Sequence, residues 1–343
     1  MEKRITSKDV AKRAGVSQAT VSYVLNNTSN QSISLQTRQK VLQAAEELHY
    51  YPDKTARRLR NQRTNCITIV MEKEISHPRY AETLQAIRDE MERHGYRMLL
   101  SRPNSPSSFH GLPTHLQDYM EKQVDGILYV SADGESPDSL TLQEVKKHSI
   151  PFVAVDAMVE DPDIGTVDVD YGYGMKLAAE ILLERGCRRF LYLRPDWETM
   201  QEKKRLFMLE QLEKERKIPV LVKMCSTKSE ESIWEEMDQI AQEASEGTGV
   251  IVSWQSHFSA VLGYFLMKNI KVPLAGLAAP SLNSWIYEQI YQSQTGAPVI
   301  HLRLPTQEIG CAGVKMLLKL IQDPSAVKKI VYRPHEVPLE KDG

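Results

Sequence analysis

The first fifty residues place apolar side chains at helical spacing between short polar breaks. Thr6 or Ser7 can cap a first helix, and Ser17 can cap a second, with Gly15 in the turn between them. A third helix is predicted over 34–48, where it adds the apolar surface that two short helices lack. The pattern therefore predicts a small all-helical domain.

From Cys66 onward, short apolar runs alternate with amphipathic helices. The runs cover 67–71, 96–100, 126–130, 151–155, 190–193, 220–224, 249–253 and 299–304. This alternation predicts parallel strands covered by helices on both faces. Near residue 165 the pattern restarts, since 167–170 leads into a helix over 174–184, so two similar lobes are expected. The predicted fold class is α/β: a helix-turn-helix domain followed by a two-lobed α/β body.

Length and composition narrow the class further. A chain of 343 residues exceeds the usual size of one hydrophobic core. Neither an apolar leader after Met1 nor a run long enough to cross a bilayer is found, so a cytoplasmic protein without membrane contact is expected. The four cysteines are scattered without a C-x-x-C pair, which argues against zinc and disulfides. No metal or cofactor is predicted.

Charge is distributed unevenly along the chain. Residues 1–65 hold 12 Lys and Arg against 5 Asp and Glu, whereas the remainder holds 31 against 40. A basic head on an acidic body favours a polyanion-binding module joined to a part with another task. A membrane surface or an acidic protein would satisfy the same charge.

The first two helices are typical of a helix-turn-helix, which places its second helix in the DNA major groove. An ordinary helical hairpin is the alternative. After the third helix, Tyr51-Pro52 stops the pattern, and the basic segment 53–60 is followed by a polar tether over 61–65. So short a helix is marginal in water, so we expect it to be disordered in the free protein and to fold on DNA.

The run from Thr6 to Asn26, TSKDVAKRAGVSQATVSYVLN, resembles the DNA-binding segment of the LacI/GalR repressor family. Tyr51-Pro52 and the later Ala56-Arg57-Arg58-Leu59 resemble the hinge helix of that family. The resemblance implies dimers whose paired hinge helices enter the minor groove, where Leu59 would push between base steps. The partner would be double-stranded operator DNA.

The same resemblance assigns contacts within the head. Gln18, Ala19 and Tyr23 fall on base-reading positions: Gln can pair with adenine, and Ala can touch a thymine methyl. Tyr23 stands where the family often has Arg or His, so readout of guanine is not expected there. Phosphate contacts are implied for Thr20, Ser22, Asn26, Ser34 and Thr37. Each of these could instead be a cap or a plain surface residue, and for Ser34 the two readings stay open.

The body resembles the periplasmic-binding-protein-like effector domain of the same family, in which a ligand binds between two lobes. The implied domains are 1–52 for the head, 53–65 for the hinge and 66–343 for the body. Within the body, an N-lobe of about 66–165 and 295–322 and a C-lobe of about 166–294 and 323–343 are expected. The ligand would be a sugar, a modified sugar or a related metabolite.

Five residues of the body are candidates for ligand contacts: Arg79, Tyr80, Asp156, Arg205 and Trp254. The fork of Arg205 suits hydroxyls, carboxylates or phosphates, although nearby charges also allow a surface salt bridge. Asp156 ends a predicted strand, where a carboxylate can also cap a helix. Trp254 can stack on a ligand or belong to the core.

The body also departs from the family. Trp254-Gln255 stands where Asn-Asp is usual, and no Asp occurs between Pro273 and Trp285, where an effector-binding carboxylate is usual. The loss of two polar groups weakens the expectation of a plain sugar. A closed pocket without a ligand stays open as an alternative.

Three functions are compatible with such a chain. A ligand-responsive repressor explains the head, the hinge and the body together. An enzyme would need a catalytic motif, and G-x-S-x-G, H-E-x-x-H and P-loop signatures are all missing from the sequence. A constitutive DNA-binding regulator whose body only dimerises is the alternative. Because no apolar heptads follow residue 335, a homodimer is expected and not a tetramer.

Overall fold

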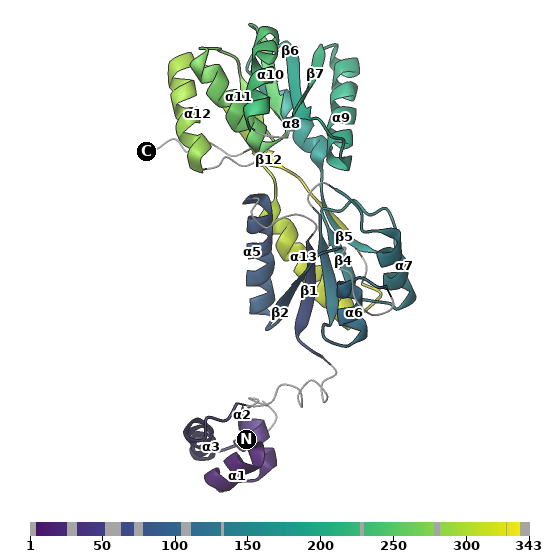
Figure 1. Cartoon of the computed structure of the whole chain (residues 1–343), viewed down its shortest axis with the longest axis vertical. Helices are drawn as coiled ribbons and strands as arrows, with labels where there is room; N and C mark the ends of the chain where they lie inside the picture. Colours follow the sequence, from purple (N-terminus) through teal and green to yellow (C-terminus); the bar gives the residue numbers. More distant parts are fainter. Residues whose placement is uncertain are drawn as a thin grey trace. The chain divides into compact units, whose positions relative to one another are not determined.

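The computed structural model describes residues 5–25, 33–51, 63–71, 78–103, 111–131, 134–226, 230–277, 282–326 and 328–336. The chain divides into two compact units, Met1–Thr64 and Asn65–Gly343. Figure 1 shows the helical first unit and the α/β second unit. Each unit is described by itself below.

The head contains helices α1 Ser7–Ala14, α2 Gln18–Leu25 and α3 Leu35–Glu47. Their inward faces bury Val10, Val21, Val24 and Val41 in one apolar cluster. Thr6 caps α1 in a reciprocal capping box, and Gly15 takes the left-handed conformation (φ 65°) that the tight turn requires. The three predicted helices are confirmed.

The N-lobe of the body is a six-stranded parallel sheet in the order β11-β5-β4-β3-β1-β2. Helices α5 and α13 cover one face, where α13 packs on β3, β4 and β5, and α6 and α7 cover the other. The elements are β1 Cys66–Met71, α5 Pro78–Arg93, β2 Arg97–Ser101, α6 Thr114–Met120, β3 Gly126–Val130, α7 Ser139–Lys147, β4 Phe152–Val155, β5 Gly165–Val169, α13 Thr306–Gln322 and β11 Lys329–Tyr332.

The C-lobe is a second six-stranded sheet, in the order β12-β10-β9-β8-β6-β7. Only β12 runs antiparallel to its neighbour. Apolar clusters lie on both faces of this sheet, as the succession of strands and helices predicts. The elements are α8 Tyr171–Glu184, β6 Arg189–Pro195, α9 Met200–Arg216, β7 Val220–Cys225, α10 Glu230–Glu243, β8 Thr248–Val252, α11 Gln255–Met267, β9 Leu274–Gly276, α12 Leu282–Thr295, β10 Val299–Arg303 and β12 His335–Glu336.

The chain crosses between the lobes three times, each time later than the sequence suggested. Strand β5 still pairs with β4 and β11 in the N-lobe, so the first crossing follows residue 169 and not 165. Strand β10 pairs with β9, which moves the second crossing from 295 to the segment 304–305. The third crossing falls at 333–334, because β11 still belongs to the N-lobe sheet. Each crossing moves because the strand before it (β5, β10 or β11) still pairs within the sheet of the lobe that the chain is leaving.

Three findings concern membrane spans, cysteines and metal ligands. Among the described residues, no helix is both long enough and apolar enough to span a membrane. The cysteines Cys66, Cys187, Cys225 and Cys311 are all free thiols. Within the same part of the chain, no group of three or more His, Cys, Asp and Glu could hold a metal ion.

Candidate functional site

The outer face of α2 presents the residues expected to read bases. Gln18 and Ala19 are exposed and Tyr23 is half-buried, whereas Val21 and Val24 point into the core of the head. The amide of Gln18 donates a hydrogen bond from Nε2 to Ser7 Oγ at 2.7 Å. This bond uses one of the two Nε2 hydrogens, so the other hydrogen and Oε1 remain for a base.

Hydroxyl groups gather at the N-termini of α2 and α3. The amide of Thr20 donates to Ser17 Oγ at 3.1 Å, and the amide of Thr37 donates to Ser34 Oγ at 3.2 Å. Ser34 thus caps α3. Each helix start keeps its remaining N–H groups directed outward, where phosphate oxygens are favourable ligands. Ser22 lies half-buried on α2.

Five residues assigned to DNA lie outside the described residues. They are Asn26, Ala56, Arg57, Arg58 and Leu59. Their assignment continues to depend on the sequence resemblance.

In the body, a cluster of charged side chains joins the two lobes. Arg79, in the first turn of α5, pairs with the Asp156 carboxylate and donates a hydrogen bond to the Tyr171 hydroxyl. The Tyr171 hydroxyl donates to Asp156 at 2.8 Å. Asp156 follows β4 with φ 55°, while Tyr171 begins α8. Residues predicted from far-apart motifs therefore meet at the crossing between the lobes.

A second charged pair lies on the C-lobe side of this cluster. Arg205 Nη1 donates to Glu202 Oε1 at 2.5 Å, and both side chains are buried, with exposed fractions of 3% and 0%. The Tyr192 hydroxyl donates to the other oxygen of Glu202. The Arg205 guanidinium lies over the Tyr171 ring, 4.9 Å from its centroid. Arg205 is thus part of a buried network and not of a surface salt bridge.

In this cluster, burial and the neighbouring charges shift the pKa of each ionisable group in opposite directions. Burial raises the pKa of Asp156 to about 6, although the charge of Arg79 acts to lower it. Burial also penalises charged Arg79 and Arg205, yet Tyr171 and Asp156 raise the pKa of Arg79 and Glu202 raises that of Arg205. Both guanidiniums therefore stay charged, each beside one carboxylate.

The space left beside this cluster is small. A cavity of about 10 Å³ lies between Tyr171, Arg205, Leu277 and Pro334, with Gly174, Leu302 and Leu304 completing its wall. Such a volume holds one water molecule at most. Next to this cavity, Arg79, Asp156 and Tyr171 are paired with one another. Among the described residues, Arg205 Nε is buried without a hydrogen-bond partner.

The other two candidate ligand residues, Tyr80 and Trp254, do not take part in these ion pairs. Tyr80 is 3% exposed and packs in the apolar core of the N-lobe. Trp254 precedes α11 and contacts Trp197 edge-on, with ring centroids 4.9 Å apart. Tyr80 adjoins the charged cluster, because it is one of the groups that raise the pKa of Arg79.

Sequence reasoning missed Tyr171 and Glu202, which complete the charged cluster. Tyr171 follows the N-cap Asp170, so it reads as an ordinary helix start. Glu202 lies beside Lys203 and Lys204 in the sequence, so it reads as part of a solvated face. A helical spacing of three between Glu202 and Arg205 is the one signal that pairs them.

A helix-turn-helix head and a two-lobed body with a polar inter-lobe cluster together define a DNA-binding regulator with an effector-type domain. Residues 6–53 match the model of bacterial regulatory proteins of the lacI family. Residues 64–230 match the model of periplasmic binding proteins and the sugar-binding domain of the LacI family. The chain belongs to the LacI family.

Individual relatives agree with this assignment. The ribose operon repressor of Halalkalibacterium halodurans is 34% identical over 189 residues, which cover 55% of this chain and 54% of that protein. The match thus spans about half of that relative. Catabolite control protein A of Staphylococcus epidermidis is 25% identical over 337 residues, 97% of each chain. These relatives are transcriptional regulators and not enzymes.

The fold also matches a solved structure. The lac repressor dimer bound to operator and the anti-inducer ONPF superposes with a TM-score of 0.75 over 98% of each chain, at 20% identity. This likeness establishes the fold, and the predicted α/β class with its helix-turn-helix head is confirmed.

Proposed function

We propose that this chain is a homodimeric transcriptional repressor that binds a pseudo-palindromic operator and responds to a small ligand held between its lobes. The observation that supports the DNA-binding half most directly is the outer face of α2. There, exposed Gln18 and Ala19 stand above a buried apolar face, as a recognition helix requires.

Two such heads related by a two-fold axis would read half-sites about one helical turn apart. Gln18 would pair with adenine, Ala19 would touch a thymine methyl, and Tyr23 would donate one hydrogen bond or pack on a methyl. Thr20, Ser22, Asn26, Ser34 and Thr37 would bind phosphates and fix the register. The segment Ala56–Leu59 would enter the minor groove between the half-sites, and Leu59 would open a base step.

The ligand site follows from the inter-lobe cluster. Arg79, Asp156 and Arg205 offer two cationic forks and one carboxylate, and the buried Arg205 Nε is available to an acceptor. A ligand with hydroxyl or anionic oxygens would bind to Arg79 and Asp156 in place of the ion pair that these two residues form with each other. Tyr80 and Trp254 would contact the ligand at the edge of the site. A relative named as a ribose operon repressor and the solved complex of the regulator CelR with cellobiose make sugars and related metabolites the first class to test.

A constitutive regulator whose body only dimerises is the second candidate. The observation that favours it is the mutual pairing of Arg79, Asp156, Tyr171 and Arg205, beside which the described residues enclose a cavity of about 10 Å³. A ligand must displace these pairs, so its binding free energy must exceed the cost of separating them.

One experiment tests the proposal and separates the two candidates. Operator sites are selected from random double-stranded DNA, and affinity is then measured at fixed salt with and without sugars, sugar phosphates and nucleobases. A palindromic site whose affinity shifts with one compound supports the ligand-responsive repressor. A palindromic site that ignores all of them favours the constitutive regulator, and failure to select a site refutes both.

A further inference from the structure

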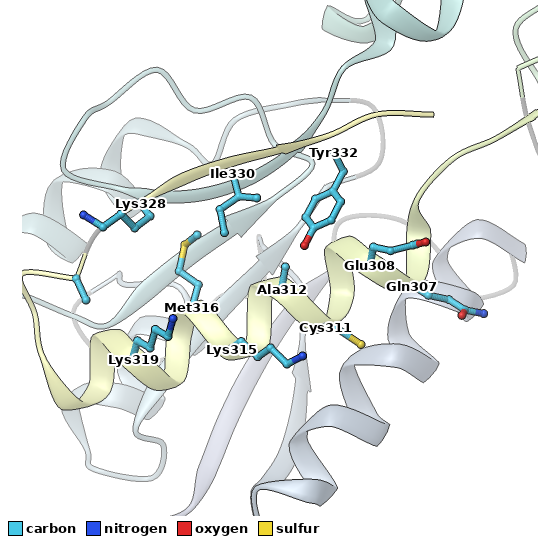
Figure 2. Close-up of a pocket in the computed structure, with 11 residues that line it drawn as sticks. Gln307, Glu308, Cys311, Ala312, Lys315, Met316, Lys319, Lys328, Ile330 and Tyr332 are labelled. Atoms are coloured by element: carbon cyan, nitrogen blue, oxygen red, sulfur yellow. The ribbon is translucent and has the colours of Figure 1, made fainter. Parts of the chain in front are cut away.

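A groove lies on the N-lobe, away from the inter-lobe cluster. It has a volume of about 550 Å³ and runs between α13 and the edge strand β11. Figure 2 shows Ile330 and Tyr332 of β11 pointing toward Met316 and Ala312 of α13. Met316 and Ala312 are buried, so the floor of the groove is apolar. Its volume is in the range of small-molecule sites.

The charge of the groove is strongly one-sided. Lys315, Lys319 and Lys328 line it, against the single carboxylate of Glu308. Glu308 belongs to the first turn of α13 and Lys319 to the last, so the two lie at opposite ends of the groove. Lys315 Nζ lies 3.8 Å from Glu90 Oε1, and the same carboxylate also pairs with Arg93 and His94.

The ammonium groups of Lys319 and Lys328 have no ion pair within 4.0 Å among the described residues. Lys319 also offsets the dipole of α13, as a basic residue in a last turn does. That role does not explain Lys328, which comes from the facing strand segment. Asp323 accepts hydrogen bonds from the backbone N–H and the hydroxyl of Ser325, and its carboxylate interacts electrostatically with Lys328. Two cations from separate segments thus line the same end of an apolar groove.

We infer that this groove is a second ligand site, which binds a small organic phosphate with its apolar part over Met316 and its phosphate between Lys319 and Lys328. A flexible ammonium suits a phosphate as a point charge, and an apolar floor adds affinity that inorganic phosphate cannot obtain. The site is distinct from the cleft residues Arg79 and Arg205.

The position of the groove gives its ligand a route to the rest of the body. Helix α13 starts directly after the crossing at 304–305, and β11 ends directly before the crossing at 333–334. The backbone of β11 also pairs with β5, which leads to the first crossing. A ligand that pulls α13 and β11 together therefore acts on segments that set the relation of the lobes, and DNA must change ligand affinity by the same factor.

Phenyl phosphate is the probe, because it combines one phosphate monoester with one apolar ring. Its dissociation constant is measured by calorimetry on the full chain, beside phenol and inorganic phosphate. We expect phenyl phosphate to bind more tightly than either, and more weakly as salt rises. The double variant K319Q/K328Q should lose at least about tenfold in affinity. The control Lys147→Gln, on α7, removes one positive charge elsewhere in the same lobe and should stay within about twofold.

Alkylation of thiols locates the bound probe. Phenyl phosphate should slow the modification of Cys311, which lines the groove, and leave that of Cys66 in β1 unchanged. Circular dichroism checks that each variant is folded. The proposal is overturned if the parent protein does not bind the probe, if K319Q/K328Q binds it as the parent does, or if Arg205→Gln abolishes binding, which would move the site to the cleft. A bound probe that leaves operator affinity unchanged would overturn the coupling to the crossings.

Discussion

Replacing Glu202 by glutamine should destabilise the body strongly, because it leaves the buried Arg205 without its counter-charge. At an effective dielectric constant of about 20, charge centres about 4 Å apart attract by about 4 kcal/mol. Removing one partner of a buried pair generally costs about 3–5 kcal/mol. Because the side-chain amide introduced by this substitution would still accept one hydrogen bond, we expect a loss of about 3 kcal/mol.

The assay is urea unfolding followed by tryptophan fluorescence. All four tryptophans, Trp197, Trp234, Trp254 and Trp285, belong to the C-lobe, so the signal reports on the lobe that contains Glu202. It is not affected by unfolding of the head, which has no tryptophan.

A neighbouring pair supplies the matched control. Glu198 lies 3.5 Å from Lys203, and both side chains are more than half exposed. Glu198→Gln should therefore cost about 1 kcal/mol or less. The double variant E202Q/R205M should recover part of the loss, because no buried charge is left unpaired. If Glu202→Gln costs no more than the control, Glu202 does not compensate Arg205 and the reasoning is refuted.

Three more substitutions test other parts of the chain. Burial lowers the pKa of His115 to about 4, so the unfolded chain takes up a proton near pH 6.5 and the folded chain does not. The free energy of unfolding should therefore fall by about 3 kcal/mol as the pH drops from 6.5 to 4. In urea unfolding of His115→Asn, this contribution to the pH dependence should be missing. Gly313→Ala should destabilise the N-lobe by about 1–3 kcal/mol, since its Cβ would lie 2.6 Å from Val155 Cγ2, and equal stability in thermal unfolding would contradict this packing. The control Gly263→Ala, whose nearest contact is at 3.9 Å, should gain about 0.5–1 kcal/mol. Leu59→Ala should weaken binding to the selected operator by at least about 1 kcal/mol, because bending a site costs roughly 1–6 kcal/mol and an inserted leucine would offset part of that cost. Unchanged affinity in a gel-shift titration would show that Leu59 does not insert between base steps.

The head could be predicted almost completely because its structure is local. Caps at Thr6, Ser17 and Ser34 and the turn at Gly15 are encoded within a few residues of the helices they bound. The choice between capping and phosphate contact at Ser34 needed coordinates, since one hydroxyl can serve either role. The hydrogen bond of Gln18 could not be predicted from the sequence either, because its partner Ser7 belongs to another helix.

The body was predictable in class but less so in its site. Strands and helices follow from periodicity, yet β9 is only three residues long and was not predicted. Arg79, Asp156 and Arg205 were singled out separately, and only the fold showed that they meet around Tyr171. The burial of Glu202 could not be predicted, because it depends on contacts with distant segments of the chain, and hydrophobic periodicity contains no information on such contacts.

The N-lobe is built from two stretches of chain that are made at very different times. Its first five strands are complete by residue 169, but α13 and β11 come only at 306–332. Helix α13 covers Leu128 and Val155 on the sheet face, so a ribosome must add the C-lobe elements from α8 to β10 before that face is buried. During this interval the nascent N-lobe exposes an apolar sheet that chaperones can recognise, whereas the segments of the C-lobe up to β10 are already present. Truncations before residue 306 should therefore yield aggregation and not a smaller working regulator.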